Sequence, residues 1–115
     1  MSDKPDDVRF ENRTALLRFG ELKYTLRGVT AGVAAFLRVP VSVEREGKSH
    51  LDRVDLSSAR ARKRFAEQAA RNIGAEAASV EGHLVAILAL LEEMARDEVE
   101  KSARLRGERI VDQAG

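Results

Sequence analysis

The chain has 115 residues, enough for one domain with a small hydrophobic core. Charged residues make up 34% of it, but the formal net charge is only +1, which excludes a nucleic-acid binder that works by overall charge alone. The absence of cysteine excludes disulfides, thiol nucleophiles and cysteine-ligated metal sites.

The N-terminal third of the chain predicts a mobile lead-in and then a β-hairpin. Residues 1–12 are polar and show no hydrophobic period, so we expect them to be mobile. From Thr14 the apolar residues recur at every second position on both sides of Gly20-Glu21, a pair suited to a tight type II′ turn. A two-residue turn there places six apolar side chains on one face through the pairs Phe19–Leu22, Leu17–Tyr24 and Ala15–Leu26.

A second hairpin follows the segment Gly28–Ala35, which fits a loop, although Thr30–Phe36 could close one helical turn. The alternation returns at Leu37, and Pro40 within it cannot donate to a strand ladder, which favours an edge strand. With a turn at Glu46-Gly47, the predicted cross-strand pairs are Val43–His50, Val41–Asp52, Val39–Val54 and Leu37–Leu56.

Two helices complete the predicted fold. Ser57 or Ser58 can cap a first helix over residues 58–73, and Gly74 marks the turn into a second, longer helix from about residue 77. The second helix has an apolar stripe typical of a helix packed along its length, formed by Val80, Leu84, Ile87, Leu91 and Met94 and widened by Val85, Leu88, Ala95 and Val99.

The predicted class is therefore α+β, with an antiparallel sheet of two β-hairpins (about four strands) followed by a two-helix hairpin with a long C-terminal helix. We assign residues 13–106 to this single domain and residues 107–115 to a frayed tail.

A basic cluster on the first helix is the main candidate binding site. Its members are Arg60, Arg62, Lys63, Arg64 and Arg71, with Glu67 the one acidic residue among them. Phosphate contact is the functional interpretation, because such contacts hold a nucleic acid without reading its sequence. The alternative is a solvated face paired with acidic residues of the second helix, namely Glu92, Glu93, Asp97, Glu98 and Glu100.

Histidines and carboxylates provide a weaker candidate site. His50 and Asp52 are two apart on a strand and so point the same way, but a metal site needs further ligands. We expect a polar strand end instead, with Asp55 assisting the serines at the helix start and with no catalytic residue, metal or cofactor. His83, beside the apolar stripe, is expected to pack or to lie at an interface.

The junction of the two helices fits two interpretations. Ala70, Gly74 and Val80 have the spacing of a DNA-binding helix-turn-helix. The second helix is apolar nearly all round, however, which favours a plain helical hairpin. That apolar surplus also suggests a structural or interaction module that forms a homodimer through Leu84, Ile87, Leu88 and Leu91.

Two short segments resemble one known family. The segment Lys23–Val29 resembles a Tyr-x-aliphatic-Arg-Gly-aliphatic strand end, and His50–Arg60 resembles a His-x-Asp-x-x-Asp-Leu-x-Ser-Ala-Arg stretch. The two family patterns are those of large bacterial and phage-like DNA primases, in the region connecting the CHC2 zinc-finger and Toprim primase core to the P-loop ATPase. The resemblance covers about residues 14–95, although Ser57 stands where the family often has an aromatic residue.

This resemblance implies a replication context without catalytic function, because the chain has no zinc-finger cysteines, Toprim acidic motif or P-loop. We therefore expect a non-enzymatic accessory module of a DNA primase- or helicase-like system, with DNA or replication proteins as partners. No stretch resembles a signal peptide and no apolar run is long enough to span a membrane, so we expect a cytoplasmic location and no membrane contact.

Overall fold

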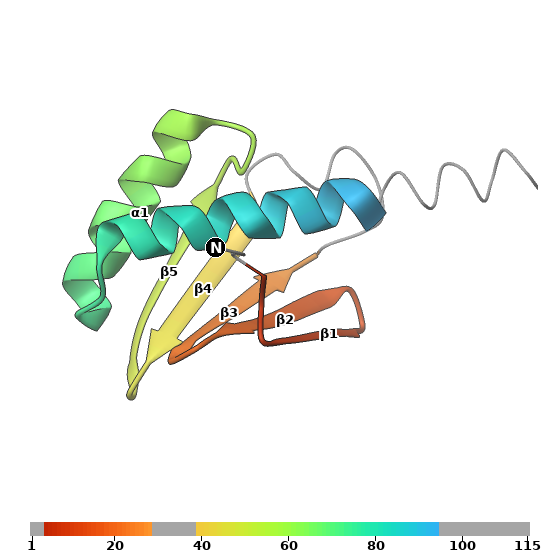
Figure 1. Ribbon diagram of the computed structural model, residues 1–115, viewed down its shortest axis with the longest axis horizontal. Coiled ribbons are helices and arrows are strands. Elements are labelled where there is room, and N and C mark those ends of the chain that lie inside the picture. The colour runs from red at the N-terminus through yellow and green to blue at the C-terminus, as the bar shows by residue number, and fades with distance from the viewer. Residues whose placement is uncertain (1–3, 29–38, 95–115) are drawn as a thin grey trace, which may run out of the picture.

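An antiparallel sheet forms one layer of the protein and two helices form the other (Figure 1). The computed structural model describes residues 4–28 and 39–94. Each strand pairs with the next in chain order; they are β1 (Asp7–Glu11), β2 (Thr14–Phe19), β3 (Leu22–Arg27), β4 (Val39–Arg45) and β5 (Lys48–Val54). Helix α1 (Ala59–Ile73) and a second helix over residues 77–94 follow. The predicted α+β class is confirmed.

The described sheet has five strands, so the prediction of about four is wrong. The additional strand, β1, lies inside the predicted mobile lead-in and pairs with β2 from Asp7↔Arg18 to Glu11↔Thr14. Asn12 and Arg13, which both have positive φ angles, form the tight turn between β1 and β2. Strand β1 could not be predicted from the hydrophobic period, because Val8 is its one residue that packs against the core.

Both predicted hairpin registers are confirmed. The β2–β3 pairing contains Phe19↔Leu22, Leu17↔Tyr24 and Ala15↔Leu26, and the β4–β5 pairing contains Val43↔His50, Val41↔Asp52 and Val39↔Val54. The predicted Leu37–Leu56 pair and the choice between loop and helical turn lie outside the described residues. Gly20 has a φ of 59°, as the first position of a type II′ turn requires.

The prediction that the strand containing Pro40 is an edge strand is wrong, because β4 lies between β3 and β5. On the β3 side the register ends at Leu26↔Val41, one residue short of Pro40. On the β5 side Pro40 is still paired, opposite Arg53. A proline is tolerated here because it stands just past the end of one of the two ladders.

Local capping defines α1 at both ends. The Ser58 Oγ accepts a hydrogen bond from the Ala61 N–H at 3.2 Å, so Ser58 is the N-cap of the two candidate serines. Gly74 takes the left-handed conformation, with a φ of 71°, and its N–H donates to the Ala70 carbonyl at 3.0 Å. The Nη1 of Arg45 adds hydrogen bonds to the Ile73 and Gly74 carbonyls at 3.3 and 3.1 Å.

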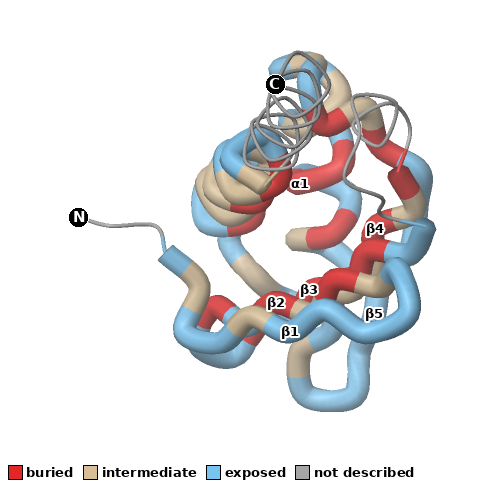
Figure 2. The backbone as a smooth tube through the Cα atoms, turned by 90° about the vertical axis from the view of Figure 1, so that its right-hand side faces the viewer, coloured by how far each residue is buried: buried red, intermediate tan, exposed pale blue. Residues whose placement is uncertain are grey.

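The core lies between the two layers (Figure 2). Within the second helix Val80, Leu84, Ile87 and Leu91 are buried, as the stripe predicts, and Met94 packs partly against them. Val85 is 47% exposed, so the stripe is narrower than predicted on that side. Ala95 and Val99 lie outside the described residues. No helix in the described part of the chain is both long and apolar enough to cross a membrane.

Candidate nucleic-acid interface

A groove of about 460 Å³ lies where β5 ends and α1 begins. Val54 and Phe65 contribute its buried apolar lining. Its charged lining residues are Arg53 from β5, Arg60 and Arg64 from α1, and the two carboxylates Asp52 and Asp55. Three basic residues from two elements therefore line one concave surface.

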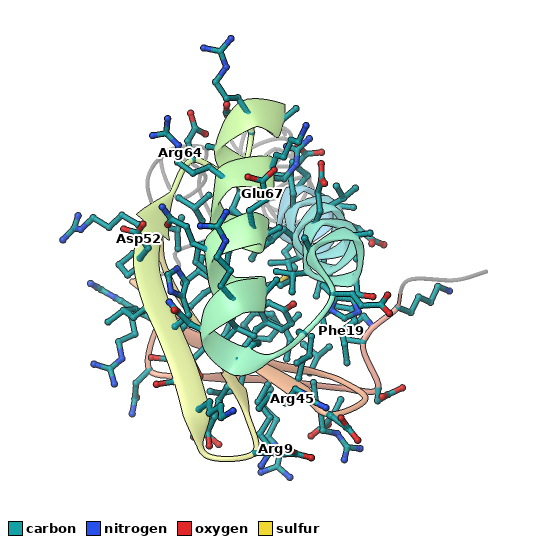
Figure 3. The ribbon with its side chains drawn as sticks, turned by 90° about the vertical axis from the view of Figure 1, so that its left-hand side faces the viewer. Arg9, Phe19, Arg45, Asp52, Arg64 and Glu67 are labelled. Carbon is teal, nitrogen blue, oxygen red and sulfur yellow. The ribbon has the colours of Figure 1, made fainter. Side chains whose placement is uncertain are left out.

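Arg60 and Arg64 are placed in the groove by helix geometry. They are four residues apart, so they lie one above the other on the same side of α1. In Figure 3, Arg64 lies on the side of the helix toward β5, from which Asp52 projects. Both arginines are exposed, and neither forms an ion pair with any described residue. Their charges are therefore available to an external anion.

The carboxylates in the groove are engaged with nearby backbone. Asp55 Oδ1 accepts hydrogen bonds from both the N–H and the hydroxyl of Ser57, at 3.0 and 2.5 Å. Asp55 therefore assists Ser57, the residue directly before the N-cap Ser58, which is one of the two serines that the sequence offered. Asp52 Oδ1 accepts from the Arg53 N–H at 2.8 Å. Three arginines against two carboxylates leave a formal surplus of one positive charge.

Arg62 differs from the other basic residues of α1 because it is half-buried, and its assignment to the phosphate-binding set stays a prediction. Its Nη1 donates to the Leu56 carbonyl at 2.5 Å, and its Nε is buried with no partner among the described residues. The side chain is half-buried because its position falls on the inner face of α1, one turn before the buried Phe65 and Ala66. This hydrogen bond links Arg62 of α1 to the backbone of the segment between β5 and α1.

Lys63 and Arg71 are exposed but do not line the groove. Lys63 lies about 100° round the helix from Arg64, and Arg71 lies two turns further along. Neither forms an ion pair with a described residue, so the predicted pairing with Glu92 and Glu93 is absent from the described part of the chain. The other predicted acidic partners, Asp97, Glu98 and Glu100, lie outside it.

Sequence reasoning missed Arg53 as a site residue. It lies at the end of β5, directly before the buried Val54 and the turn into α1. The available signal was its position: a basic residue at a strand end that is followed, within a few residues, by a basic helix start. Only the packing of α1 on β5 brings it beside Arg60 and Arg64.

His50 packs against α1 rather than joining a metal site. Its Nδ1 lies 2.7 Å from the Asn72 amide nitrogen, and its ring meets Phe65 edge-on at 5.0 Å. Asp52, on the same side of the strand, remains exposed. The described residues contain no group of three or more histidine, cysteine or acidic side chains placed to hold a metal.

The other histidine, His83, packs in an aromatic cluster. Its Nδ1 lies 3.0 Å from the Tyr24 hydroxyl, and its ring stacks on Phe19 at 4.2 Å. Burial raises the pKa of the Tyr24 phenol, because the phenolate would lose its hydration. The expectation that His83 packs beside the apolar stripe is met.

Most of the predicted dimer interface on the second helix is buried within the chain. Leu84, Ile87 and Leu91 are at most 3% exposed, because they face the sheet within the same chain. Of the four predicted interface residues, only Leu88 is partly accessible. Three of the side chains expected to meet a second copy are therefore already covered.

The helix junction keeps the local features of a helix-turn-helix. Gly74 has its positive φ, Val80 is fully buried and Ala70 is half-buried. The second helix, however, packs on the sheet with its apolar stripe, and Val80 in its first turn is buried in the same core. These features are equally those of a glycine-capped helical hairpin, the interpretation that the sequence favours.

Comparison with known proteins finds no match: no protein family model, no curated protein and no solved structure is similar to this chain.

Proposed function

We propose that this protein is a non-catalytic accessory module of a DNA primase- or helicase-like replication system, and that it holds nucleic-acid phosphates in the groove between β5 and α1. The observation that carries the proposal is the convergence of Arg53, Arg60 and Arg64 on one groove, without ion-pair partners among the described residues. A guanidinium group matches phosphate geometry with two parallel hydrogen bonds. The resemblance over residues 14–95 supports the replication context, and with it a cytoplasmic location.

The small net charge limits how this module can work. At +1 the whole chain exerts little long-range attraction on a polyanion, so binding must arise from the local surplus in the groove. Phosphate contacts position a nucleic acid without specifying its sequence. We therefore expect weak binding with little sequence preference, which suits a module that adds affinity to a larger assembly.

The test is the salt dependence of binding to fluorescent oligonucleotides. If the three groove arginines each neutralise about one phosphate, the slope of log K against log salt should be roughly −3. Changing Arg60→Ala and Arg64→Ala together should reduce the magnitude of that slope by about two. Alanine favours helix, so this double variant should keep the fold, which circular dichroism checks.

A matched control uses the same helix and the same loss of charge. Lys63→Ala combined with Arg71→Ala removes two exposed positive charges from α1 outside the groove. The slope should then change by less than about one unit. Undetectable binding of wild type at low salt would overturn the proposed function. Equal losses in both double variants would overturn the assignment of the site to the groove.

A further inference from the structure

The second face of the sheet is not covered by either described helix. In β3 and β4 buried residues alternate with more exposed ones (Figure 2). Because successive residues of a strand point to opposite faces, the buried set shares one face, where it forms one core with residues of the two helices. Arg27 alternates with Leu26, and Arg53 alternates with Val54, so both arginines belong to the open face. At one edge of this face lies β5, the strand that also lines the groove.

Arg27 and Arg53 lie at the same end of that face. Strands β3 and β5 run in the same direction, because each is antiparallel to β4 between them. On β4, Pro40 lies opposite Arg53. The neighbouring residue Val41 lies opposite Leu26, so Arg27, the next residue of β3, stands in the same row as Pro40 and Arg53. Two strand spacings separate the backbones of the two arginines by about 10 Å. The row continues to Thr14 and Glu11, where the exposed Arg13 of the turn offsets the Glu11 charge.

Arg53 therefore connects two basic surfaces. It lines the groove with Arg60 and Arg64, and it stands in the same sheet row as Arg27. Together these four arginines form a bent basic track, which runs from the start of α1 over the β5 edge to the end of β3. None of the four forms an ion pair with a described residue.

No described aromatic side chain is available to stack on bases along this track. Phe19, Tyr24 and Phe65 are at most 7% exposed. Phe10 is 45% exposed, but it pairs with the buried Ala15 and so lies on the helix side of the sheet at the opposite edge from β5. Proteins that bind single strands combine a basic groove with aromatic stacking platforms. Within the described residues, this track offers charge without stacking.

From this combination we infer that the ligand is double-stranded DNA, held by its backbone along the track formed by Arg27, Arg53, Arg60 and Arg64. The inference rests on the proposed function and names its substrate. Duplex DNA carries one charge per about 1.7 Å of its axis and keeps its bases stacked internally. A track that supplies charge alone therefore favours the duplex over an unpaired strand.

The experiment compares a duplex with a length-matched unpaired strand of the same sequence in salt titrations of the full chain. The duplex should bind more tightly at each salt concentration, with a slope of roughly −4 for four phosphate contacts, against roughly −3 for the single strand. Arg27→Ala should reduce the magnitude of the duplex slope by about one.

Lys23→Ala is the matched control for Arg27→Ala. Lys23 lies on the same strand and the same face, four residues and about 13 Å away, and is likewise exposed. Its loss should leave the duplex slope unchanged. Equal or tighter binding of the single strand would overturn the inference while leaving the proposed function standing, and so would equal effects of the two variants. No binding of either ligand would overturn both.

Discussion

At the scale of the residue, Tyr24 shows how the core constrains a polar group. The side chain is 1% exposed, and its hydroxyl lies 3.0 Å from His83 Nδ1. Phe19 meets the same ring edge-on at 5.5 Å. Burial favours the neutral phenol over the phenolate, so the pKa of Tyr24 is raised in the folded protein above its value of about 10 in an unfolded chain.

This shift predicts a specific loss of stability at alkaline pH. Because the folded pKa is the higher one, stability is unaffected below about pH 10 and falls as pH rises above it, where the unfolded chain ionises first. Tyr24→Phe should remove that part of the pH dependence, at a constant cost of about 1 kcal/mol for the lost hydrogen bond. Urea unfolding at several pH values measures both effects.

The same titration has an internal check. The chain contains one tyrosine and no tryptophan, so the ultraviolet absorbance of tyrosinate reports Tyr24 alone. Folded wild type should show that absorbance only well above pH 10, whereas protein in denaturant should show it near pH 10. Tyrosinate appearing near pH 10 in the folded protein would contradict the buried placement of Tyr24.

At the scale of the element, the second helix is defined by the face it turns to the sheet. Leu84 and Ile87 are fully buried, whereas Val85, one residue away from Leu84, is 47% exposed. The difference follows from the 100° between successive residues of a helix. Arg45 supports the junction before this helix, since its guanidinium group links Glu21 at 3.1 Å to the carbonyls that end α1.

Substitutions on the two faces of this helix should differ strongly. Ile87→Ala should lower the free energy of unfolding by about 2–5 kcal/mol, the lost transfer energy plus the cost of a cavity. Val85→Ala, the control, should change it by less than about 0.5 kcal/mol. Chemical denaturation measures the free energy of unfolding of both variants, with one m-value used for all the curves. Similar midpoints for the two variants would show that the helix does not pack as described.

At the scale of the whole molecule, both described helices lie on one face of the sheet, and the apolar stripe of the second helix packs within the chain. The long-helix dimer therefore loses most of the surface that the sequence suggested for it. Leu91 is 3% exposed, so an aspartate there places a charge in the core rather than at an interface.

We expect a monomer in solution and separate effects of two aspartate substitutions. Leu91→Asp should destabilise the fold, whereas Val85→Asp, on the exposed face, should change neither stability nor association. Sedimentation velocity over a wide concentration range, with thermal unfolding, distinguishes these outcomes. A wild-type dimer that Val85→Asp dissociates would instead support the interaction-module alternative.

The local structure of this protein follows from short-range signals in its sequence. Both hairpin registers follow from the period of two and the turn residues, because a shift by one residue would turn every apolar side chain to the wrong face. The start and end of α1 follow from Ser58 and Gly74, since a side-chain acceptor and a left-handed φ act within a few residues. The five basic residues of α1 could likewise be named from the sequence.

The tertiary structure alone decided which surfaces meet. It placed β4 inside the sheet, added β1 as an edge strand, turned Arg62 inward and brought Arg53 beside Arg60 and Arg64. It also placed the stripe of the second helix in the core with the sheet. A hydrophobic pattern shows that a face must be covered but does not identify what covers it, because burial of apolar area is non-directional.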